Sequence, residues 1–254
     1  MRKKYLFACV LLFIFACNKQ KQKGELTLPA NSQQVLLVIA ENDTTIRGEA
    51  QLFQWENKQY RWLAQSEKTA ITLGRTGLAW GRGVHDAKWV KGQTKKEGDG
   101  KAPMGFFPIT ELFGYAEKST LPFQTKMPYI QATKSLICVD DVNSRHYNQI
   151  FDAADDRKRE IDWKSKEDML RKDKLYELGA VIDYNVSNTT KGEGSCVFLH
   201  IWRSPSSPTA GCTAGDLQAM QTIFSKLNPE KKPLLVQLTR AEYEEIKELV
   251  RLPE

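Results

Sequence analysis

Cys212 and His200 are the pair of residues whose types and spacing are best suited to catalysis. An apolar run over residues 195–202 predicts a strand that contains His200. A Ser/Pro loop follows at residues 204–208, and then a turn of small residues that ends at Cys212. The loop is able to fold back and bring the imidazole within hydrogen-bonding distance of the thiol, whose proton it would take. The pattern therefore predicts acyl transfer through a cysteine nucleophile.

The surroundings of the turn favour a reactive thiol. Apolar residues at helical spacing predict a helix over about residues 214–228, and the partial positive charge of a helix N-terminus stabilises a thiolate. Gly211 lets the backbone approach a substrate, and the amides around Gly211 and Cys212 would form an oxyanion hole. The alternative is that Cys212 is a buried packing thiol and His200 a strand-end residue bonded to backbone. The residue types alone leave both interpretations open.

The first residues bear on the compartment. Arg2, Lys3 and Lys4 precede an apolar run at residues 5–16 that is too short for a transmembrane helix. The run ends Ile14-Phe15-Ala16-Cys17, which resembles a bacterial lipobox. We therefore expect a lipoprotein signal peptide at 1–16 and lipid on Cys17, followed by a flexible tether to residue 34. An ordinary secretory signal with an incidental Cys17 is the alternative.

Composition and charge describe an ordinary globular protein. Of 254 residues, 27% are charged and 41% are hydrophobic. Removing the three basic residues of the signal from the net charge of +6 leaves +3, which is too weak to indicate nucleic acid binding. We expect an exported bacterial lipoprotein at the periplasmic face of the cell envelope.

Three of the five cysteines would remain after the signal is removed and Cys17 is lipidated: Cys138, Cys196 and Cys212. An odd number leaves at least one thiol without an internal disulfide partner. Cys138 and Cys196 both lie in apolar runs, so each is either a small core residue or half of a Cys138–Cys196 disulfide.

The order of apolar runs predicts one mostly-β domain over residues 35–254, with few helices. Residues 51–65 read as a hairpin, residues 131–141 as a strand, and residues 241–251 as a terminal helix. The charged residues 152–173 predict either a surface helix or a long excursion of irregular chain away from the sheet. Residues 95–101 predict a solvated loop.

Metal sites are weakly supported. Cys196, His200 and Cys212 are three possible zinc ligands, but no CxxC pair and no fourth ligand accompany them. Asp140 and Asp141 lack a third acidic ligand at a suitable spacing, and a turn at the end of a strand explains them better. We expect neither a metal nor a cofactor.

Two separated motifs give the chain a resemblance to the L,D-transpeptidase catalytic domain, the YkuD-like family. Leu199-His200 and Thr209-Ala210-Gly211-Cys212 resemble the family's histidine strand and nucleophile turn. Residues 98–107 (GDGKAPMGFF) resemble its Gly-Asp…Pro-x-Gly-x-Phe segment, and Gly74-Arg75-Thr76-Gly77 its earlier strand and turn. The resemblance covers about residues 70–240.

The resemblance implies a β-rich, sandwich-like domain with a helix after the catalytic cysteine and peripheral helices. Cys212 would attack the diaminopimelate carbonyl of a peptidoglycan stem peptide, with His200 as base and then acid. Thr209 and Gly211 would shape the turn, and a backbone carbonyl would orient His200. The insertion between residues 109 and 184 would supply a substrate lid. The candidate walls of the cleft are Tyr184, Asn185, Trp202 and Arg203, with a core or surface role as the alternative for each.

The expected partners are stem peptides, the membrane through the N-terminal lipid, and carbapenems that acylate the thiol. An amine acceptor would give a 3–3 crosslink or attach a protein, whereas water would make the enzyme an L,D-carboxypeptidase. A sortase-like transpeptidase also has histidine before cysteine, but it needs a strand arginine soon after the cysteine, and Arg240 comes late. A non-catalytic wall-binding lipoprotein is the remaining alternative.

Overall fold

The computed structural model describes residues 28–154 and 160–254. The expected signal peptide at 1–16 and Cys17 lie outside these residues. Leu28 is buried in the core, and a short 3-10 helix at Pro29–Asn31 leads into the first strand at Gln34. The folded part therefore includes residues that we expected to belong to the tether.

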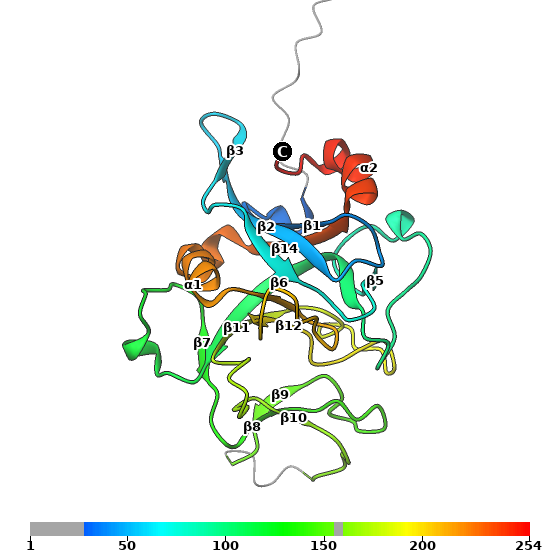
Figure 1. The fold of residues 1–254 in the computed structure, drawn as a ribbon, viewed down its shortest axis with the longest axis vertical. Coiled ribbons are helices and arrows are strands. Elements are labelled where there is room, and N and C mark those ends of the chain that lie inside the picture. The colour runs from blue at the N-terminus through cyan, green and yellow to red at the C-terminus, as the bar shows by residue number, and fades with distance from the viewer. Residues whose placement is uncertain (1–27, 155–159) are drawn as a thin grey trace, which may run out of the picture.

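Eight strands of the main sheet close into a barrel (Figure 1). Closure depends on β1 (Gln34–Ala40), which pairs in parallel with β14 (Pro233–Thr239) and antiparallel with β2 (Arg47–Glu56). Between β14 and β2 the order around the barrel is β6 (Ala102–Gly114), β11 (Leu178–Ile182), β12 (Phe198–Ile201), β13 (Thr213–Gly215) and β4 (Thr69–Thr72). The mostly-β prediction is confirmed. The main sheet closes on itself, and so the expectation of a two-sheet sandwich is not confirmed.

Three shorter strands extend the main sheet: β3 (Arg61–Ala64), β5 (Leu78–Trp80) and β7 (Tyr129–Gln131). β3 pairs with β2 and confirms the predicted hairpin, while β5 and β7 pair with β6. β14 is buried along its whole length because the barrel interior lies on one side and α2 (Arg240–Val250) contacts it from the other.

The described residues form two α-helices, both close to their predicted positions. α1 (Leu217–Lys226) follows the cysteine turn and buries Met220, Ile223 and Phe224. α2 confirms the terminal helix and is capped by Thr239, whose hydroxyl accepts a hydrogen bond from the Glu242 amide. Neither helix has the length and apolar character needed to cross a bilayer.

A second sheet lies at the end of the molecule away from α2 (Figure 1). Its strands are β8 (Leu136–Cys138), β9 (Ile150–Asp152) and β10 (Glu167–Asp168). The strand expected over 131–141 is thus reduced to β8 and the end of β7. Residues 160–173 contain β10 and turns but no helix, so this part of the charged segment is a long excursion. A Cys138–Cys196 disulfide joins the small sheet to the chain before β12 and resolves the alternative that the sequence left open.

The turn between β4 and β5 requires glycine at position 77. Gly77 has φ of +89°, and a Cβ atom there would meet the Asp43 carbonyl oxygen at 2.1 Å. Gly92 has a similar φ of +78°, but no atom lies within 4 Å of its would-be Cβ. A side chain at either position would be strained by the positive φ, but only a side chain at position 77 would also overlap other atoms.

We expect Gly77→Ala to lower the free energy of unfolding by roughly 3 kcal/mol or more, because strain and a backbone clash add. Gly92→Ala, the matched control, should cost only roughly 1–2 kcal/mol. Urea denaturation of both variants measures the difference. Equal losses would show that the close approach to Asp43 has no energetic effect.

Candidate active site

The pairing of β12 with β13 places His200, on β12, close to Cys212, which directly precedes β13. The strands are parallel, and His200 pairs with Ala214. Cys212 precedes β13 and lies beside Phe198, whose amide donates to its Sγ at 3.3 Å. The cysteine and the histidine are therefore offset by two residues, or about 7 Å along the strand direction.

Thr209 closes the turn that presents the cysteine. Its hydroxyl donates to the Cys212 carbonyl at 2.6 Å and accepts the Gly211 amide at 3.1 Å. The Thr209 backbone is held from the other side, because its amide donates to the Leu73 carbonyl and its carbonyl accepts the Arg75 amide. The turn is thus tied to the end of β4 as well as to itself.

The two motifs that carry the family resemblance lie against each other. A Cβ atom on Gly211 would lie 3.1 Å from the Lys101 carbonyl oxygen and 3.5 Å from Lys95 Nζ. Lys95 was expected in a solvated loop, but its side chain is only 5% exposed and pairs with Asp99 at 2.9 Å. The Asp99 carboxylate in turn accepts the Lys96 and Lys101 amides. A buried, compensated cation therefore stands beside the cysteine turn.

The Cys212 thiol is closed off from solvent in this conformation. The residue is 8% exposed, and its Sγ donates to the Cys196 carbonyl at 3.8 Å. Burial, and after it the negative charge of Glu167, raises the thiol pKa to about 12. The Phe198 amide and the charge of Lys95 oppose this shift without cancelling it. The thiol is consequently protonated at neutral pH.

The expectation that a helix N-terminus activates the thiol is wrong. α1 begins at Leu217, and β13 separates it from Cys212. Its first amides are already bonded, because the Asp216 carboxylate accepts from Gln218 and Ala219. The Asp216 carboxylate therefore neutralises the partial positive charge at the helix N-terminus. The helix also begins five residues after Cys212, beyond the first turn over which this charge acts.

His200 is buried and electrically neutral. Burial lowers its pKa to about 4, although the carbonyls of Ile201 and Leu175 favour the protonated ring. Its Nδ1 donates to the Ile201 carbonyl at 2.8 Å, so the backbone carbonyl that orients the ring is that of Ile201. No hydrogen bond joins His200 to Cys212, both of which the structure describes. A neutral imidazole is nevertheless the form that can accept a proton.

Two residues from the segment between positions 109 and 184, Tyr176 and Glu167, lie beside this pair. Tyr176 is buried, and its ring lies 5.3 Å from that of His200 and 5.6 Å from that of Phe198. Its hydroxyl donates to Glu167 at 2.5 Å. Sequence reasoning missed both residues, because they lie in an irregular charged segment with no motif. Only the position of the insertion between the two halves of the resemblance indicated a lid.

The four candidate cleft residues occupy different settings. Tyr184 and Asn185 are buried and internally bonded: Tyr184 donates to the Glu193 carbonyl, and Asn185 donates to the Thr190 and Gly194 carbonyls. Trp202 is half-buried, and its amide donates to the Gly215 carbonyl. Arg203 is exposed and pairs with Asp173 at 3.3 Å. The structure thus places Tyr184 and Asn185 inside the fold and Arg203 at the exposed surface.

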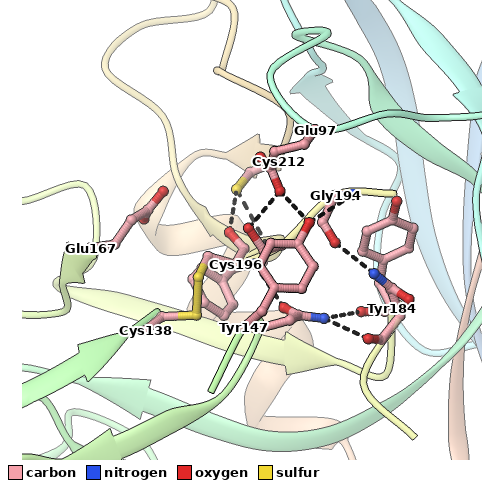
Figure 2. The surroundings of a disulfide bond; sticks show 12 residues. Glu97, Cys138, Tyr147, Glu167, Tyr184, Gly194, Cys196 and Cys212 are labelled. Atoms are coloured by element: carbon pink, nitrogen blue, oxygen red, sulfur yellow. Dashed lines mark hydrogen bonds between the residues drawn. A yellow bond between two sulfur atoms is a disulfide. The ribbon is translucent and has the colours of Figure 1, made fainter. Parts of the chain in front are cut away.

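The disulfide belongs to the same apolar cluster as the nucleophile candidate. Figure 2 shows the Cys138–Cys196 disulfide beneath Cys212. Beside it, the Tyr147 hydroxyl donates a hydrogen bond to the Glu97 carboxylate. The cluster consists of Phe113, Ala132, Leu136, Cys138, Met169, Tyr176, Cys196, Phe198 and Cys212. Because Cys196 is bonded to Cys138, its sulfur is not available as a zinc ligand. Over residues 28–154 and 160–254 no group of three acidic, histidine or cysteine side chains is arranged to hold a metal.

Asp140 and Asp141 end β8 in a turn, as expected. The Asp141 carboxylate accepts hydrogen bonds from the amides of Asn143 and Lys164. These bonds fix the turn and lower the pKa of Asp141.

A cavity of about 390 Å³ is lined in part by Cys138, Asn148, Val181 and Phe198. Phe198 contributes to the lining of this cavity, and its amide also donates to the Cys212 thiol.

Comparisons with known proteins identify no family for this chain. No family model matches the chain, and no curated protein is significantly similar to it. A crystal structure of the helical cell shape determining protein Pgp2 from Campylobacter jejuni matches with 13% identity and a TM-score of 0.40. The match covers 85% of this chain and 52% of that protein, so the chain spans about half of its length.

We expect the thiol to react slowly in the absence of a ligand. With a pKa of about 12, Cys212 should be alkylated by iodoacetamide at pH 8 at least about 100-fold more slowly than N-acetylcysteine. The rate should rise with pH without a plateau below pH 10, because the thiolate fraction grows tenfold per pH unit. Peptide mass spectrometry at Cys212 measures it. Urea should restore an ordinary rate, and a plateau near pH 7 in the folded protein would contradict the closed site.

Proposed function

We propose that this protein is a cysteine acyltransferase of the L,D-transpeptidase type that acts on peptidoglycan stem peptides. The observation that carries the proposal is the contact between the Gly211–Cys212 turn and the Gly98–Phe107 segment, the two motifs of the resemblance. They come together beside a neutral, oriented histidine on the adjacent strand.

The first step starts from a protonated thiol and a neutral imidazole, and it requires substrate binding to bring their pKa values closer together. Cys212 Sγ attacks the carbonyl carbon of diaminopimelate, and His200 takes the thiol proton as the S–C bond forms. The C–N bond to D-alanine breaks, and the imidazolium gives the proton to the leaving amine. This leaves a thioester on Cys212, a neutral imidazole and free D-alanine.

The second step returns the enzyme to its starting state. The side-chain amine of a second stem peptide attacks the thioester and loses a proton through His200 to the departing sulfur. The product is a 3–3 crosslink, or an attached protein where the amine belongs to one. In this structure the Cys212 thiol is hydrogen-bonded to the Cys196 carbonyl and the Phe198 amide. Catalysis therefore requires the side chains of Cys212 and His200 to meet when substrate binds.

We also propose that the protein works outside the cytoplasm as a lipoprotein anchored through Cys17. The charged and apolar N-terminal residues and the lipobox-like ending support this placement. The Cys138–Cys196 disulfide is consistent with it, because such bonds persist in oxidising compartments.

A carbapenem tests the nucleophile. Incubation with the full chain should give a single adduct at Cys212 by intact-mass and peptide mass spectrometry, and Cys212→Ala should give none. His200→Gln should slow the acylation about 100-fold or more, because the thiol proton then lacks an acceptor. The disulfide cysteines serve as an internal control, since neither has a free thiol. No adduct on the wild type, or an equal adduct on Cys212→Ala, would reject the nucleophile.

The reaction products separate crosslinking from trimming. With disaccharide tetrapeptide as the substrate, we expect a crosslinked dimer together with released D-alanine, resolved by liquid chromatography and mass spectrometry. The Cys212→Ala variant gives the background. Disaccharide tripeptide as the sole product would rule out crosslinking and assign a carboxypeptidase.

A further inference from the structure

A cavity of about 350 Å³ opens between two loops on the other side of Lys95 from the cysteine turn. This volume lies at the small end of ligand sites, so it suits an amino acid or a short peptide end. One wall comes from residues 80–95 and contributes Arg82 and His85. The other comes from residues 183–193 and contributes Asp183 and Glu193. The cavity thus has a basic wall and an acidic wall.

A weak ion pair and the hydrogen bond from the Asn185 amide to the Arg82 carbonyl join the two walls. Arg82 Nη1 lies 3.2 Å from Glu193 Oε2, and the two side chains are 46% and 39% exposed. An exposed pair of this kind contributes little stability, so a ligand is able to open it. A ligand with one charge would leave either Arg82 or Glu193 without a partner. A zwitterion gives each of them a new partner, because its carboxylate pairs with Arg82 and its ammonium with Glu193.

Two further groups suit a zwitterion. Asp183 lines the acidic wall, and its carboxylate accepts the Ser187 amide and hydroxyl but has no ion pair among the described residues. On the basic wall, His85 Nδ1 accepts the Phe106 amide, which leaves the proton on Nε2. Burial lowers the His85 pKa to about 4, so the ring stays a neutral donor at pH 7.

The cavity is next to the proposed chemistry. Lys95 lines it, and Lys95 Nζ lies 3.5 Å from the position of a Cβ on Gly211. A Cβ on Gly194 would meet Lys95 Cε at 3.1 Å, so this side chain fills the space between the cavity wall and the turn. A ligand in the cavity would therefore lie one side chain away from the residues beside Cys212.

We propose that this cavity binds the zwitterionic end of an amino acid, with the carboxylate at Arg82 and His85 and the ammonium at Glu193 and Asp183. Under the proposed function, on which this assignment of the ligand rests, the occupant is the D-amino acid that leaves or the amine that accepts the acyl group. The site is a binding site and takes no part in bond making.

Three small probes test the charge requirement by ligand-observed NMR titration of the full chain. D-Alanine carries both charges, N-acetyl-D-alanine only the carboxylate, and D-alaninamide only the ammonium. We expect D-alanine to bind and each analogue to bind at least tenfold more weakly. Equal or tighter binding of either analogue, or no binding of D-alanine, would overturn the proposal.

Side-chain variants locate the site. Arg82→Gln and Glu193→Gln should each weaken D-alanine binding at least tenfold. The matched controls are Arg145→Gln and Glu160→Gln, which break an exposed ion pair (56% and 80% exposed) outside the cavity and should leave binding unchanged. Unchanged binding in both cavity variants, or an equal loss in the controls, would reject the site.

The result is independent of the nucleophile test. Binding that follows this pattern without any carbapenem adduct would keep the site and reject the acyltransferase. An adduct at Cys212 without D-alanine binding would keep the acyltransferase and reject the site.

Discussion

The parallel pairing of β12 with β13 is the constraint on which the candidate site depends. Its register fixes Cys212 beside Phe198 and two positions from His200. A parallel pair needs a connection that leaves the sheet and returns, and here the Ser/Pro loop makes it without a helix. Thr209 ties that loop to the end of β4, so the turn is held at both of its ends.

Burial has opposite effects on the two reactive groups. It raises the pKa of Cys212 and lowers that of His200, because in each case the charged form loses its hydration. The result is a neutral thiol and a neutral base, held apart by their own backbone partners. A neutral thiol is a poor nucleophile, so this arrangement disfavours exchange between the unpaired thiol and the disulfide of the same cluster.

The sequence predicted regular elements and local motifs better than it predicted environments. The 3.6-residue spacing predicted α1 and α2, and alternation predicted the β2–β3 hairpin, because these patterns are local. It could not predict barrel closure, which depends on β1 pairing with a strand near the other end of the chain. It misjudged Lys95, since only the fold brings Asp99 and the cysteine turn around that side chain. Tyr176 had no motif, and its position beside His200 follows from tertiary packing alone.

The closure of the barrel also sets the order in which the protein is able to fold. β1 lies between β2, its neighbour in sequence, and β14, and Gln34 further bonds the Lys226 carbonyl 192 positions away. A chain emerging N-terminus first can form the β1–β2 hairpin early, but it exposes the other edge of β1 until nearly every residue is available. The barrel therefore closes only once β14 is available, and until then the free edge of β1 is open to pairing with another strand.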